Sequence, residues 1–78
     1  MARYLRDVLE WIRDERVSCE LHVRGGTSYV LYGWYHTYEI SQILEDCLIL
    51  EYIIYPTEEE SKTVVVPFHS IDKIVIRG

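Results

Sequence analysis

The chain has 78 residues, of which 49% are hydrophobic and 27% are charged, a composition that argues against wholesale disorder. Its formal net charge of −5 argues against duplex binding, which depends on many Lys and Arg side chains at phosphates. A single strand can still bind such a chain through stacking and a local basic rim. The length predicts one domain, residues 1–78, that would gain stability from self-association.

The sequence lacks the common catalytic templates. It has no phosphate-binding loop, nucleophile elbow or His-Glu-x-x-His helix, so we expect a protein that is not an enzyme and uses no cofactor or metal. Cys19 and Cys47 have no metal-ligand spacing and are interpreted as small buried hydrophobic residues. Because no apolar run is long enough for a membrane span or a signal segment, we expect a cytoplasmic protein with no membrane partner.

The first segment has the spacing of an amphipathic helix, which we expect over residues 2–15. Arg6 and Glu10 are spaced for an i,i+4 ion pair on its polar side. Trp11 flanks the apolar side and could widen it. The residues predicted to form the buried stripe are Tyr4, Leu5, Val8, Leu9 and Ile12.

A period of two follows the helix and predicts strands. Residues 17–23 alternate between apolar and polar side chains, and the paired glycines Gly25 and Gly26 predict a tight hairpin turn. Residues 28–38 are rich in aromatic side chains on both faces, which predicts a long strand that bends at Gly33.

The rest of the chain predicts further strands and turns. Residues 39–46 could continue the bent strand or form a helical turn, and we favour the strand. We expect strands at residues 47–55, 62–68 and 73–77, separated by an acidic turn at 56–61 and a corner at 69–72. The fold class is therefore α+β and mainly β: an N-terminal helix, residues 1–16, followed by a strongly bent five-stranded antiparallel sheet or small open barrel, residues 17–78.

Two groups of side chains have more than one interpretation. The aromatic residues between positions 29 and 38 could be a stacking platform for unpaired bases, or core and subunit contact; the second is favoured because no Lys or Arg is interleaved with them. Glu20 and His22 share a strand face, which permits an acid–base pair. Exposed pairs of this kind are more often only solvated polar side chains.

Three segments together resemble the Sm-like family, and within it the bacterial Hfq branch. They are the end of the helix with the following strand and glycine turn (13–26), an acidic residue before an apolar strand (44–50), and the stretch around His69 (66–74). Phe68 stands where the Hfq branch has a basic residue, and Leu48 stands near the position of its base-stacking aromatic residue.

The resemblance implies a strongly bent five-stranded barrel that assembles into a closed ring and binds single-stranded RNA. Neighbouring subunits of such rings join through the fourth and fifth strands, here residues 62–68 and 73–77. His69 matches the base-binding histidine of the family. We expect His69 to contact a base edge, and Arg24 and Lys73 to contact phosphate.

A weaker resemblance also points to RNA. Residues 5–9, 23–25 and 66–69 are similar to the small archaeal domain thought to recognise RNA cyclic phosphate ends. The first hypothesis is therefore an RNA-binding or RNA-scaffold subunit of an Sm-like homo-oligomer. The alternative is a protein–protein assembly module without a nucleic-acid ligand, and a small hydrolase that uses Glu20 and His22 is a third possibility.

Overall fold

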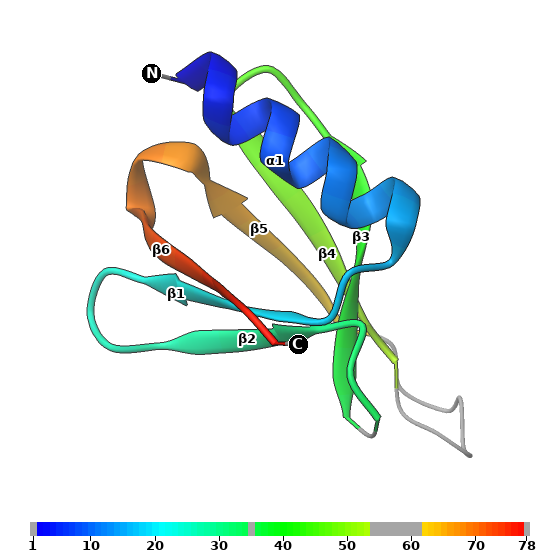
Figure 1. The fold of residues 1–78 in the computed structure, drawn as a ribbon. Helices are drawn as coiled ribbons and strands as arrows, with labels where there is room; N and C mark the ends of the chain where they lie inside the picture. The colour runs from blue at the N-terminus through cyan, green and yellow to red at the C-terminus, as the bar shows by residue number, and fades with distance from the viewer. Residues whose placement is uncertain (1, 35, 54–61, 78) are drawn as a thin grey trace.

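A computed structural model describes residues 2–34, 36–53 and 62–77 (Figure 1). The predicted helix is α1, Ala2–Glu15. The helix is terminated by the next residue, Arg16, whose φ of 52° is left-handed, and the Val17 N–H donates to the Ile12 carbonyl over 3.0 Å. The predicted ion pair is present, with 3.6 Å between Arg6 Nε and Glu10 Oε2. In the part of the chain that the structure describes, no helix has the length and hydropathy needed to cross a membrane.

The described residues form six strands of one mixed sheet. Figure 1 shows α1 lying across this sheet. The order across the sheet is β5-β4-β3-β2-β1-β6, so β5 and β6 are its two edges. A short 3₁₀ helix, η1 (Phe68–Ser70), connects the edges. The strands are β1 (Cys19–Val23), β2 (Ser28–Leu31), β3 (Thr37–Ile43), β4 (Cys47–Ile53), β5 (Thr63–Pro67) and β6 (Ile71–Ile76).

The predicted long bent strand is in fact two strands, so the expectation of a five-stranded antiparallel sheet is wrong. The chain breaks between β2 and β3, where Tyr32 and His36 have left-handed φ values of 54° and 34°. Thr37 holds this turn, since its hydroxyl donates to the Val30 carbonyl over 2.9 Å and accepts from the Gly33 N–H over 2.7 Å.

This break also makes the sheet mixed. Leu31 of β2 and Tyr38 of β3 form a parallel pair, whereas the other neighbouring strands are antiparallel. The expectation of a strongly bent sheet or small barrel is not met either: the sheet stays open and is not strongly curled. What the prediction and the structure share is an α+β, mainly β, architecture with one N-terminal helix.

The other described turns lie close to the positions predicted from the sequence. Gly25 and Gly26 have φ values of 95° and 90° in the β1–β2 turn, as expected for a glycine hairpin. Residues 39–46 are strand only as far as Ile43, because the chain then turns and the Leu44 N–H donates to the Cys47 carbonyl over 2.9 Å. The end of the strand predicted for 47–55 and the acidic turn at 56–61 lie outside the described residues.

The core lies between α1 and one face of the sheet. Leu9 and Ile12 of the helix are fully buried, and Leu5 is partly buried against them. Tyr4 and Val8 are 75% and 38% exposed, so their assignment to the buried stripe is wrong. The buried residues contributed by the sheet are Cys19, Leu21, Leu31, Ile40, Ile43, Leu48, Leu50 and Val66. Cys19 and Cys47 are free thiols. Cys19 is fully buried, as predicted, whereas Cys47, which was expected to be buried too, is only partly buried.

Candidate functional site

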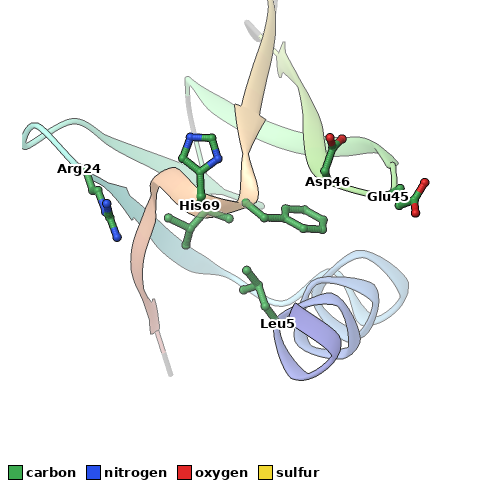
Figure 2. A pocket seen from close by; sticks show the side chains of 7 residues that line it. Leu5, Arg24, Glu45, Asp46 and His69 are labelled. Carbon is green, nitrogen blue, oxygen red and sulfur yellow. The ribbon is translucent and has the colours of Figure 1, made fainter. Parts of the chain in front are cut away.

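A pocket of about 570 Å³ opens where α1, the β1–β2 turn, the β3–β4 turn and η1 approach one another. Figure 2 shows His69 in the middle of this region, with Arg24 on one side and Asp46 and Glu45 on the other. The apolar part of the lining comes from Leu5, Phe68 and Ile71. The pocket therefore combines a guanidinium, an imidazole and two carboxylates around an apolar surface.

Backbone hydrogen bonds fix the turns that surround this pocket. The Arg24 N–H donates to the Ser70 carbonyl over 2.8 Å, which joins the β1–β2 turn to η1. On the opposite side, the Phe68 N–H donates to the Asp46 carbonyl over 3.0 Å, which joins η1 to the β3–β4 turn. The Ser70 hydroxyl donates to the Pro67 carbonyl over 2.8 Å and closes η1 itself. The short helix is thus tied to both neighbouring turns.

A side chain of α1 is hydrogen-bonded to the β3–β4 turn beside the pocket. The Arg6 guanidinium donates to the carbonyl oxygens of Leu44 and Ile43, over 2.5 and 3.3 Å. These residues directly precede the acidic pair that lines the pocket. A hydrogen bond from a charged donor is stronger than a neutral one, so Arg6 restricts the turn that carries Asp46.

The structure brings together two of the three predicted site residues. Arg24 and His69 line the same pocket although they are far apart in the sequence. Lys73 does not line it: the register shift in the β1–β6 pair leaves Lys73 beside His22, whereas the pocket-lining Ile71 pairs with Val23. His22 and Val23 are consecutive on β1 and face opposite sides of the sheet, so Lys73, the partner of His22, lies on the other face from Ile71, the partner of Val23.

Sequence reasoning missed the acidic side of the pocket. Asp46 was singled out only within the family motif, and Phe68 only as a departure from it. Their proximity depends on the backbone pair between η1 and the β3–β4 turn, which links residues twenty-two positions apart. No local spacing rule reveals such a pair, but two consecutive acids between apolar strands were an available signal.

The pair Glu20 and His22 does form on the outer face of β1. His22 Nε2 lies 3.2 Å from Glu20 Oε1, and Arg77 Nε lies 3.6 Å from Glu20 Oε2. The carboxylate therefore has two partners on an open sheet face, an arrangement that ordinary surface residues adopt. Within residues 2–34, 36–53 and 62–77, no three His, Cys, Asp or Glu side chains are grouped as metal ligands.

Three tyrosines of the sheet pack on one another. Tyr38 lies between Tyr29 and Tyr52, with ring centroids 5.1 and 4.8 Å away. Burial, and to a lesser extent the two neighbouring phenols, raises the pKa of the Tyr38 hydroxyl. Trp34 is different, since it is 94% exposed on the turn between β2 and β3. The packed tyrosines agree with a structural role rather than an open stacking platform.

Comparisons with known proteins identify no relative. No protein-family model, curated protein or solved structure matches the chain.

Proposed function

We propose that the chain is an RNA-binding subunit of an Sm-like ring. The observation that carries the RNA assignment is the shared pocket of Arg24 and His69, the residues expected to contact phosphate and a base edge. Arg24 supplies a fixed positive charge for phosphate, and His69 supplies ring nitrogens for a base edge. The partly buried Phe68 offers an apolar surface for an unstacked base.

The order of the strands supports a ring. If β2 and β3 are counted as one interrupted strand, β5 and β6 are the fourth and fifth strands through which Sm-like subunits join. They are also the two edges of this sheet. Each edge presents unpaired backbone groups, and Val65 on β5 and Ile76 on β6 are 57% and 45% exposed. Pairing β5 of one copy with β6 of the next is a heterologous contact, which can repeat until a ring closes.

The RNA assignment is tested with a short fluorescent uridine- and guanosine-containing RNA, by anisotropy at several salt concentrations. Arg24→Ala combined with His69→Ala should weaken binding by about tenfold or more and reduce its salt dependence. Arg13→Ala is the matched control, because Arg13 pairs with Asp14 on α1 and does not line the pocket. Equal losses in both variants, or no binding by the unmodified protein, would overturn the assignment.

Lys73 needs its own variant because it lies on the other face. If phosphates follow the outer face of β6, Lys73→Ala should lower the affinity and remove about one unit from the salt slope. An unchanged slope would restrict the RNA path to the pocket side. The Lys73 variant and the pocket variant together determine which face of the sheet the RNA follows.

The ring is tested by the mass in solution, measured by light scattering at two concentrations. The unmodified protein should be a stable closed oligomer, and Val65→Lys should dissociate it by placing a charge on the β5 edge. Val8→Lys makes the same change on the exposed side of α1 and should leave the mass unchanged. A monomer at both concentrations would refute the ring.

A protein–protein assembly module without nucleic acid is the second candidate. It is favoured by an exposed apolar stripe on α1, where Tyr4, Val8 and Trp11 are 75%, 38% and 48% exposed at i, i+4 and i+7. The same experiments separate the candidates. Dissociation by Val8→Lys, together with no RNA binding, would identify the helix face as the contact and support this second function.

A further inference from the structure

We propose that the pocket selects guanine over uracil. This inference rests on the proposed RNA function and names the base that the pocket would recognise. Its basis is the acidic side of the lining, Asp46 and Glu45, opposite Arg24 across His69 (Figure 2). With two carboxylates and one guanidinium, the pocket is not a simple anion site. It suits a ligand that is anionic at one end and donates hydrogen bonds at the other.

The two ends of the pocket lie on turns that flank the same short helix. Arg24 belongs to the β1–β2 turn and Asp46 to the β3–β4 turn, and both turns are hydrogen-bonded to η1 between them. A phosphate at Arg24 and a base edge at Asp46 would therefore be held by one connected framework. The volume of about 570 Å³ falls in the range, roughly 300–1,000 Å³, of small-ligand sites.

The choice of base follows from hydrogen-bonding chemistry. An ionised carboxylate only accepts hydrogen bonds, and its two oxygens match two adjacent donors. The Watson–Crick edge of guanine provides such donors in its N1–H and N2 amino groups. Uracil provides one N–H between two carbonyl oxygens, whose lone pairs would face the carboxylate. Asp46 therefore favours guanine and opposes uracil, while Phe68 gives the larger purine ring more apolar contact.

The carboxylate is also well placed to discriminate. Arg6 holds the carbonyl groups of residues 43 and 44, and the Asp46 carbonyl is held by the Phe68 N–H. A backbone fixed at both points reorganises little when a ligand binds, so less binding free energy is lost in ordering the turn. The Asp46 side chain itself is exposed and available to the ligand.

The experiment compares two short RNAs of equal length, one made of uridine alone and one with every second uridine replaced by guanosine. The unmodified protein should bind the guanosine-containing RNA about tenfold more tightly. Asp46→Asn keeps the shape but replaces one acceptor oxygen with a donor, so it should remove most of this preference, chiefly by improving uridine binding. Thermal unfolding of the variant confirms that the fold is retained.

Glu51→Gln is the matched control, because Glu51 is exposed on β4 and does not line the pocket. It removes the same charge and should leave the preference intact. Equal binding of the two RNAs, or the same loss in both variants, would overturn the guanine inference and leave the RNA function standing. Failure to bind either RNA would remove both proposals.

Discussion

The backbone N–H of Arg24 donates a hydrogen bond to the Ser70 carbonyl over 2.8 Å, which joins the glycine turn of the first hairpin to the short helix before the last strand. One consequence is that the conformation of the glycine turn determines where the Arg24 guanidinium lies relative to His69. The stability of that turn and the proposed RNA affinity of the pocket are therefore expected to change together.

The first prediction concerns the stability of the glycine turn at Gly25, which has a φ of 95° and no atom within 4 Å of the place of a Cβ. Gly25→Ala should destabilise the fold by about 1–2 kcal/mol, because its cost is backbone strain rather than collision. Gly25→Asn should cost less, since Asn tolerates left-handed angles better. Chemical denaturation measures both, and equal stabilities of the two variants would contradict the explanation.

A second prediction concerns the Thr37 hydroxyl, which serves both the Val30 carbonyl and the Gly33 N–H in the break between β2 and β3. Thr37 is buried, so Thr37→Val, which is similar in shape, would leave two backbone groups without this partner. We expect a loss of about 1–3 kcal/mol in the free energy of unfolding. Thr37→Ser keeps the hydroxyl and should lose less; a larger loss for Ser than for Val would refute the hydrogen-bond argument.

The third prediction concerns Gly33, where an added Cβ would collide with a neighbouring side chain. A Cβ at this position would lie 2.8 Å from Val30 Cγ1. Gly33→Ala should therefore destabilise the protein by about 1–3 kcal/mol, since the branched Val30 side chain has little freedom to move away. In a Val30→Ala background the same change should cost clearly less. A double-mutant cycle by denaturation measures the difference, and additive effects would exclude the steric explanation.

The fourth prediction is a pH dependence that originates at Cys19. Burial raises the pKa of this thiol from 9.0 to about 11. The unfolded chain then loses the proton at a lower pH than the folded chain does. The stabilisation is fully present below pH 9.0 and is lost as the pH rises towards the folded value of about 11.

The measurement is denaturation across that pH range for the unmodified protein and for Cys19→Ala. The unmodified protein should lose about 2–3 kcal/mol more than the variant does. Tyr32 and Tyr38, whose pKa values are also raised by burial, are present in both proteins and add the same slope to each. Parallel curves would show that the thiol proton does not contribute.

Local patterns predicted much of the fold. The helix, the glycine hairpin and the final strands follow from periodicity and turn chemistry, which act over a few residues. The break between β2 and β3 was predicted only as a bend at Gly33. It depends on the Thr37 hydroxyl, which takes the place of a strand partner, and a side-chain bond of this kind leaves no periodic signal.

Tertiary placement explains the other differences. Tyr4 and Val8 have the right helical spacing for burial, but the helix rests on an open sheet that covers only a narrow stripe around Leu9 and Ile12. For the site, Arg24 and His69 were selected with the help of the family resemblance, and both line the pocket. The contribution of Asp46 required a contact between distant turns, which only the folded chain reveals.

The edges of the sheet at β5 and β6 link the proposed assembly to the stability of the chain. In a lone molecule, water satisfies the outward backbone groups of these strands. A strand that pairs there binds the native state and not the unfolded one, so it adds to the free energy of unfolding by mass action. The melting temperature of this chain should thus rise with its own concentration if copies pair edge to edge. A melting curve at a single concentration would therefore describe the assembly as much as the subunit.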